Sequence, residues 1–356
     1  MNAIFSISAV IVLVLAAALG AQGDGQHATM GQKVFGIVIP YIAIALFLVG
    51  FVYRILRWAR VPVPFRIPTT CGQAKSQDFK HSKLEAPYTT LQVIARMALE
   101  ILFFRSLFRN TRAKYREEDN RFVYAPTKWL WLAGLAFHYA FLVIFIRHFK
   151  YFTEPVPGFV TVAQELDGFF QIGLPILYLT DAVIIAAVTY LFLRRVFVPH
   201  VKYISLASDY FPLALILGIA LSGVWMRYFG KVDLVGVKEL ATGLLSGAPT
   251  IPPTVGAAFY VHLFLVSVLI AYFPWSKLMH MPGVFLSPTR NLANNNRSVR
   301  HVNPWNYPVK THPYHEYEDE FRELMAGCGV PLEKPLEKTE AEPEPQKKAA
   351  AAGKEE

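Results

Sequence analysis

Charge and cysteine are both scarce in this sequence of 356 residues. Only 17% of the residues are charged, whereas 54% are hydrophobic, and this balance is typical of a membrane protein rather than of a soluble globule. The two cysteines, Cys71 and Cys328, lie far apart in polar segments, so the chain alone cannot build a disulfide framework or a cysteine-ligated cluster. No C-x-x-C-H string is present, which excludes covalently attached c-type haem.

Nucleotide and zinc motifs are missing as well. The sequence contains no Walker A, G-x-G-x-x-G or H-E-x-x-H string, which removes the usual sequence grounds for nucleotide or zinc chemistry. The net charge of +9 lies in loops between apolar stretches, which points to membrane orientation and not to a nucleic-acid partner. We interpret Cys71 as a reduced surface thiol, with a contact to a cytoplasmic partner as the alternative.

Six stretches are long and apolar enough to cross a lipid bilayer. A hydrocarbon core of about 30 Å requires roughly 20 apolar residues in a helix. The first stretch has no basic residue before it, so we interpret it as a retained anchor rather than a cleaved signal peptide. The expected fold class is an all-α integral membrane protein of six transmembrane helices. These helices are predicted at about 3–21, 34–56, 128–149, 169–193, 210–229 and 255–276.

The distribution of Lys and Arg predicts the orientation. The segments that follow the second, fourth and sixth predicted helices are rich in both residues, and segments of this kind stay in the cytoplasm. The loops at 22–33, 150–168 and 230–254 carry fewer cations and several acids. We therefore predict a multi-pass protein of the cytoplasmic (inner) membrane with both termini in the cytoplasm.

The predicted spans divide the chain into six parts. The basic loop after the second helix contains an amphipathic stretch, Arg96–Phe108, which predicts a helix that lies on the inner leaflet or docks a partner. The end of the chain has too few bulky apolar residues to fold. In order, the parts are an N-terminal transmembrane helix with its outer loop (1–33), a second transmembrane helix (34–56), the cytoplasmic basic loop (57–127), a four-helix bundle (128–282), a cytoplasmic extension (283–331) and a disordered tail (332–356).

Four of the ten histidines lie within or at the ends of the predicted spans. His138 and His148 are on the third helix, His262 is on the sixth, and His280 lies just past its cytoplasmic end. Intramembrane ionisable groups are costly and usually functional, and neutral imidazole is the commonest metal ligand. From the predicted helix directions, His138 and His280 belong to an inner level, and His148 and His262 to an outer level. Two histidines at each of two depths are what two stacked bis-histidine haems require.

The spacings do not match for ideal parallel helices, but helix tilt and a break in the sixth helix can reconcile them. Ten residues on the third helix rise about 15 Å, whereas eighteen on an unbroken sixth helix would rise about 27 Å. A break at Pro274, between His262 and His280, can shorten the second separation. The alternative is that the histidines only hydrogen-bond neighbouring helices or lie at the membrane surface, an explanation that suits His148 and His280 singly better than it suits all four together.

Polar residues near the outer ends of the third and fourth helices are further candidates. Lys150 follows His148 by two residues and is a candidate quinone contact, with a role as an interfacial anchor as the alternative. Arg147, Glu165 and Asp167 are weaker candidates for the same role. Asp181, inside the fourth helix, can support a histidine Nδ1, carry protons, or bond a neighbouring hydroxyl, and the last, structural role is the one that we favour.

At the four histidines the chain resembles the gamma subunit of respiratory nitrate reductase, a di-haem cytochrome b that oxidises quinol. The resemblance rests on the two histidine spacings and on the string Phe-Pro-Trp-Ser-Lys-Leu-Met-His, which ends at His280. A closer resemblance is to one branch of that family, the DsrM (also called HmeC) membrane subunit of the sulfite-reduction-associated Dsr complex (DsrMKJOP). Like this chain, that branch has an additional N-terminal span. The strings of this sequence that resemble the branch lie at 63–73, 104–111, 128–132, 137–139 and 146–148.

The resemblance implies a role for each histidine. His148 and His262 would ligate the iron of an outer haem b, and His138 and His280 the iron of an inner haem b. Menaquinol would be oxidised near the outer haem. Electrons would pass inward to a cytoplasmic iron-sulfur subunit of the heterodisulfide-reductase type (DsrK type) in dissimilatory sulfur metabolism.

The resemblance also implies partners beyond the lipid bilayer. A periplasmic multihaem cytochrome c, a periplasmic ferredoxin-like iron-sulfur protein and a second quinone-interacting membrane subunit complete the family's complex. This chain has no iron-sulfur ligands and no thiol pair, so the terminal disulfide chemistry belongs to a partner. The alternatives are a related redox complex with a different reductase, or a non-redox membrane anchor or transporter, and the lack of an internal repeat argues against a transporter.

Overall fold

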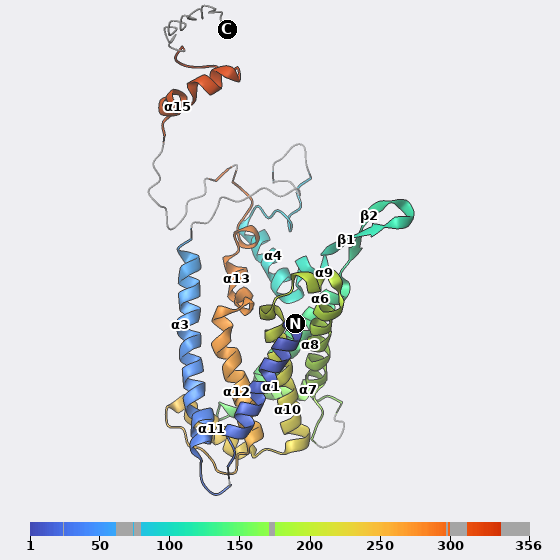
Figure 1. Ribbon diagram of the computed structural model, residues 1–356, viewed down its shortest axis with the longest axis vertical. Helices are drawn as coiled ribbons and strands as arrows, with labels where there is room; N and C mark the ends of the chain where they lie inside the picture. Colours follow the sequence, from blue (N-terminus) through green and yellow to red (C-terminus); the bar gives the residue numbers. More distant parts are fainter. Residues whose placement is uncertain are drawn as a thin grey trace, which may run out of the picture. The chain divides into compact units, whose positions relative to one another are not determined.

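The computed structural model describes two separate units. The described residues are 1–23, 25–61, 74, 80–170, 175–296, 298–299 and 312–335, and the chain divides after Pro304. The larger unit is a bundle of long helices, shown in Figure 1. Among the described residues, five helical segments are long and apolar enough to cross a membrane: Asn2–Gly20, Met30–Ala59, Lys128–Tyr151, Ala207–Gly230 and Ala257–Trp275.

Each of the five spans has a counterpart among the six predicted helices, with small differences at the ends. They consist of α1 (Asn2–Gly20), the continuous run of α2 (Met30–Lys33), η1 (Val34–Val38) and α3 (Ile39–Ala59), α6 (Lys128–His148) with η3 (Phe149–Tyr151), α10 (Ala207–Trp225) with η4 (Met226–Gly230), and α12 (Ala257–Tyr272) with η5 (Phe273–Trp275). The remaining helices of this unit are α4 (Thr90–Phe103), α5 (Arg105–Phe108), α7 (Gly158–Asp167), α8 (Leu179–Phe197), α9 (Pro199–Ile204), α11 (Leu234–Ser246), α13 (His280–Gly283) and α14 (Pro288–Asn291), with 3₁₀ turns η6 (Lys277–Met279) and η7 (Val284–Leu286).

The fourth predicted helix begins ten residues later than expected. The prediction of a helix over 169–193 was wrong at its start, because α8 begins at Leu179. Pro175 lies inside the predicted segment, where a helix would lose a backbone hydrogen bond and clash with the preceding turn. α8 packs beside α6 and α10. It carries Asp181 in its first turn and Arg194 and Arg195 in its last, and it is not one of the five spans.

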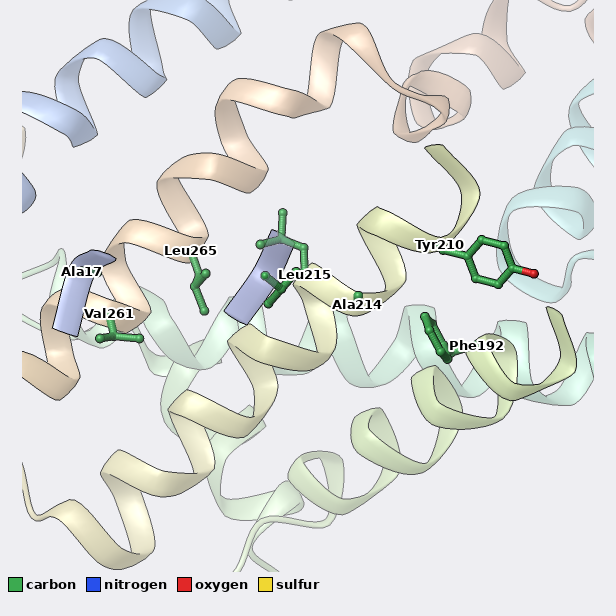
Figure 2. Close-up of a cluster of buried hydrophobic side chains, with 8 residues drawn as sticks. Ala17, Phe192, Tyr210, Ala214, Leu215, Val261 and Leu265 are labelled. Carbon is green, nitrogen blue, oxygen red and sulfur yellow. The ribbon is translucent and has the colours of Figure 1, made fainter. Parts of the chain in front are cut away.

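The first helix packs into the bundle. α1 lies against α10 and α12, and its small Ala17 is fully buried, which allows close approach of the helices. Figure 2 shows this cluster, in which Leu215 of α10 and Leu265 of α12 point toward the α1 segment. Both leucines are fully buried. We conclude that α1 is part of the packed structure and not an appended tail.

Gly50 lets α3 approach the end of α12 closely. A Cβ atom at this position would lie 2.8 Å from Pro274 Cβ and 3.1 Å from Trp275 Cζ2, which is too close for an unshifted side chain. We expect Gly50→Leu to separate the two helices. The free energy of unfolding of the detergent-solubilised protein, measured by thermal unfolding, should fall by about 1–3 kcal/mol, the usual cost of overpacking. The neighbouring, exposed Val49 gives the control Val49→Leu, and equal stability of the two variants would contradict this packing.

One end of the bundle carries a β-hairpin, and we call it the hairpin end. Strands β1 (Thr111–Arg116) and β2 (Arg121–Pro126) pair antiparallel, and Asn120 adopts the left-handed conformation at the turn. The prediction of an all-α chain was therefore wrong for this segment. The alternation of side chains along both strands and the Glu-Glu-Asp-Asn turn are the sequence signals that could have revealed it.

The amphipathic stretch Arg96–Phe108 is not one helix as predicted. α4 ends at Phe103, Phe104 adopts a left-handed backbone (φ 50°), and α5 follows. The carboxylate of Glu100 explains the bend, because it accepts hydrogen bonds from the Ser106 backbone N–H (3.0 Å) and hydroxyl (2.7 Å) and thereby pulls the chain back on itself. Arg290 of α14 binds the same carboxylate at 2.5 Å.

The opposite end contains two helices where loops were predicted. α7 lies within the predicted loop 150–168, and α11 lies within 230–254. Asp233 caps α11, since its side chain accepts from the backbone N–H groups of Val235 and Gly236. A hydrogen bond from the Thr254 hydroxyl, together with these two backbone bonds, lowers the pKa of Asp233. Both helices are amphipathic, so they cover the end of the bundle.

The smaller unit contains α15 (Tyr314–Gly327). Buried Glu318 accepts hydrogen bonds from the backbone N–H groups of Glu333 and Lys334, so residues just inside the predicted disordered tail fold back onto this helix. The rest of that tail, from residue 336, lies outside the described residues, as does Cys71. Cys328 is an exposed free thiol.

Candidate functional site

The structure brings the four histidines together as two pairs at two levels of the bundle. The ring centres of His138 and His280 are 5.9 Å apart near the hairpin end. Those of His148 and His262 are 6.3 Å apart near the opposite end. Imidazole–metal bonds of about 2 Å on either side of one ion would put two ring centres roughly 6 Å apart, so each pair has the spacing of a bis-histidine metal site.

The end of α12 explains how His280 reaches His138. The α-helix ends at Tyr272, one residue before the 3₁₀ turn that contains Pro274. Ser276 is extended (ψ 177°) and caps the next turn, because its hydroxyl oxygen accepts from the Leu278 N–H. The chain thus changes direction between His262 and His280, where an unbroken helix would have carried His280 too far.

Three of the four rings are oriented by backbone carbonyl groups. His138 Nδ1 lies 2.7 Å from the Gly134 carbonyl oxygen, His148 Nδ1 lies 2.7 Å from that of Ile144, and His280 Nδ1 lies 2.8 Å from that of Lys277. A carbonyl oxygen can only accept, so Nδ1 carries the proton in each ring. The unprotonated Nε2 is then the nitrogen that can bind a metal.

His262 is oriented by a side chain instead. Its Nδ1 lies 2.9 Å from Ser222 Oγ, and the Ser222 hydroxyl donates to the Ile219 carbonyl oxygen at 2.9 Å. The serine oxygen is therefore free to accept from Nδ1–H, which again leaves Nε2 for a ligand. Gly223 gives this ring room, because a Cβ there would lie 3.3 Å from its Cε1.

The surroundings of both pairs fit a large prosthetic group better than a small metal ion. His138 and His280 are exposed, and His148 and His262 are only partly buried, although all four belong to a bundle of apolar helices. Among the described residues, no group of three or more His, Cys, Asp or Glu side chains could hold a metal ion. A cofactor that brings its own in-plane ligands, such as haem, needs only two histidines from the protein.

Phe104 connects the His138 pair to the hairpin end. Its ring meets the His138 ring edge-on, with centres 4.9 Å apart. The left-handed backbone of Phe104 is unusual for a bulky residue, and backbone strain of this kind is concentrated at functional sites. The bend between α4 and α5 thus places Phe104, and the segment that carries it, directly beside His138.

A buried ionic network lies next to the His148 pair. Arg147 of α6 binds Asp167 of α7 (3.1 Å) and Asp181 of α8 (2.6 Å). The second Asp181 oxygen accepts from the Tyr228 hydroxyl at 2.9 Å, and Asp167 accepts from the backbone N–H and hydroxyl of Thr180. The network joins four elements, and in it Asp181 binds Arg147 and Tyr228 and not a histidine Nδ1.

The guanidinium groups of the network also stack on an aromatic ring. The central guanidinium carbons of Arg147 and Arg227 lie 3.8 Å and 4.0 Å from the centre of the Tyr178 ring, which is within cation–π range. Neither Tyr178 nor Arg227 was identified from the sequence, because the chain brings them to Arg147 from positions 31 and 80 residues away.

Lys150 lies at the edge of this network. Its Nζ is 3.4 Å from Gln164 Oε1 and 5.1 Å from the centre of the Tyr151 ring. The Tyr151 ring in turn lies 5.9 Å from that of His148. Of the other predicted quinone contacts, Glu165 is exposed, and Arg147 and Asp167 bind each other.

Long transmembrane helices with paired histidines at two levels define the class of membrane proteins built like cytochrome b. Comparison with known proteins agrees with this class. The model of the nitrate reductase gamma subunit family matches residues 89–301, and the chain belongs to this family.

Two relatives are similar over most of their length. The Hdr-like menaquinol oxidoreductase cytochrome b-like subunit of Archaeoglobus fulgidus is 46% identical over 280 residues, which cover 76% of this chain and 83% of the relative. The subunit with the same description from Archaeoglobus profundus is 40% identical over 275 residues, which cover 75% and 81% of the two chains.

Proposed function

We propose that this chain is a di-haem cytochrome b subunit that oxidises menaquinol and passes electrons across the membrane to a cytoplasmic iron-sulfur protein. The observation that carries the proposal is the pair of facing histidines at each of two levels, with every Nδ1 hydrogen-bonded and every Nε2 available. Each haem, when bound, supplies a one-electron redox centre. His148 and His262 hold the outer haem, and His138 and His280 the inner haem.

The membrane arrangement follows from the same proposal. The hairpin end faces the cytoplasm, because Lys and Arg are concentrated in the segments there, and both termini lie on that side. α8, which corresponds to the fourth predicted helix, also crosses the membrane and brings the number of spans to six. The di-haem bundle consists of α6, α8, α10 and α12. The charges of α8 are compatible with this, since Asp181 is paired with Arg147 and Arg194 and Arg195 lie in the last turn, where long side chains reach the membrane surface.

The proposed partners come from the relatives and from the family branch that the sequence resembles. Both relatives are described as subunits of an Hdr-like menaquinol oxidoreductase. We assign the electron acceptor as a heterodisulfide-reductase-like iron-sulfur subunit (DsrK type) of dissimilatory sulfur metabolism. The periplasmic multihaem cytochrome c, the periplasmic iron-sulfur protein and the second membrane subunit of a DsrM-type complex are the other proposed partners.

The test of this function is a reduced-minus-oxidised absorption spectrum of the purified chain together with haem quantitation. Two haem b per chain, reducible by a menaquinol analogue, are the expected result. A well-folded preparation without haem would refute the proposal and leave the non-redox anchor as the explanation.

Lys150 is proposed to bind the quinol by a charge-assisted hydrogen bond. Such bonds contribute about 1.5–3 kcal/mol, so Lys150→Ala should raise the KM for a menaquinol analogue roughly 10- to 100-fold while the haem content stays at two per chain. Lys33, an exposed cation at the same end, supplies the control Lys33→Ala. Identical KM values for the two variants would show that Lys150 is only an interfacial anchor.

A further inference from the structure

The β-hairpin presents two chemically different faces. In its register Tyr115 lies opposite Phe122 and Ala113 lies opposite Tyr124. These residues share one face, because side chains alternate along a strand, and the Tyr115 and Phe122 rings lie 5.2 Å apart. The other face carries the four cations of the strands, Arg112, Lys114, Arg116 and Arg121. We call these the aromatic face and the cationic face.

Nothing in the described part of the chain covers the aromatic face. Phe122 and Tyr124 are 72% and 76% exposed, and Tyr115 is 46% exposed. Figure 1 shows the two strands projecting from the helical bundle. A lone two-stranded hairpin is marginally stable in water at best, and both of its outer edges offer unpaired backbone groups. A hairpin of this kind is stabilised when another surface packs on it.

The base of the hairpin is tied to the segment that contacts His138. The Thr127 backbone N–H donates to the Asn110 carbonyl oxygen at 3.2 Å, which closes the base. Lys128 Nζ donates to the Phe108 carbonyl oxygen at 2.6 Å and lies 3.2 Å from the centre of that ring. Phe104, four residues before Phe108, packs against His138. A protein that binds the hairpin is therefore held close to the pair of His138 and His280.

We propose that the hairpin is the docking site for an acidic soluble protein, the electron-accepting iron-sulfur subunit of the proposed function, on which this inference rests. Charge complementarity supports such a partner, because all four cations of the strands lie on one face of the hairpin. An acidic groove on the partner can cover both faces of the hairpin at once. A strand of the partner can also pair with a free edge of the hairpin by β-augmentation.

A lipid surface fits the hairpin less well. The cations and the aromatic rings point to opposite sides, so a membrane that takes up the rings would leave the cations facing water. Lipid also cannot satisfy the free backbone groups of the strand edges.

The first test is co-purification of the haem-loaded, full-length chain with the co-expressed iron-sulfur subunit. The triple variant Arg112→Glu/Lys114→Glu/Arg121→Glu should reduce the amount of retained subunit at least tenfold. The control Arg57→Glu/Arg60→Glu reverses exposed cations at the end of α3 and should retain it. Undiminished retention by the triple variant overturns the docking proposal, and an intact haem spectrum in that variant shows that the proposed function itself is unaffected.

The second test asks what covers the aromatic face. A fluorophore is attached at Phe122→Cys in a chain whose Cys71 and Cys328 are replaced by serine, and the protein is placed in nanodiscs with brominated lipids. The proposal is supported if the brominated lipids quench the fluorophore only weakly and its emission spectrum shifts when the iron-sulfur subunit is added. Strong quenching by the brominated lipids overturns it in favour of membrane contact.

Discussion

Replacing His262 by alanine is expected to lower the haem content from two per chain to one. The variant keeps His148 but loses the ring that faces it at 6.3 Å, and one histidine cannot complete the bis-histidine site. His138→Ala should remove the other haem in the same way, because its ring is paired with His280. Pyridine-haemochrome quantitation of the purified variants measures both losses.

Matched variants separate ligation from general damage to the fold. Ser222→Ala should keep both haems and shift only the potential of the outer one, because this side chain orients His262 without binding a metal. His200→Ala alters an exposed histidine of α9 and should change neither haem. If His262→Ala retains two haems, the assignment of the outer pair is wrong.

Replacing Arg147 by methionine is expected to destabilise the protein by about 3–5 kcal/mol, the usual cost of leaving buried charges without their partner. Arg147 is only 7% exposed and Asp167 is 6% exposed, so water cannot compensate the carboxylate of Asp167, and Asp181 loses its ion pair as well. The free energy lost also includes the links between α6, α7 and α8. Thermal unfolding of the detergent-solubilised protein, followed by circular dichroism, measures the loss.

The ionic origin of this effect can be checked with two further variants. In Arg147→Met/Asp167→Asn/Asp181→Asn the unpaired charges are removed together, so a large part of the stability should return. Arg57→Met removes an exposed arginine at the end of α3 and should change stability by less than about 0.5 kcal/mol. If Arg147→Met and Arg57→Met unfold alike, the network does not hold this end of the bundle together.

Local polar and backbone features explain where the sequence was misread. Pro175 delays the start of α8, and Glu100 bends the chain at Phe104 through hydrogen bonds to Ser106. Both effects depend on single residues inside segments whose average composition favours a helix. The network around Arg147 was seen only in part, because Arg227, Tyr178 and Tyr228 meet it from distant positions, and neither hydropathy nor spacing predicts such contacts.

The sequence by itself determined the class of protein and the positions of five membrane-crossing helices, because a bilayer core demands long apolar stretches whatever their neighbours are. It also singled out His138, His148, His262 and His280, because ionisable residues are rare in such stretches. Only the tertiary structure decided how these histidines face one another, how α12 ends to allow it, and where the hairpin projects. Those features depend on bends, caps and buried ion pairs between residues far apart in the chain, which form only when the helices pack.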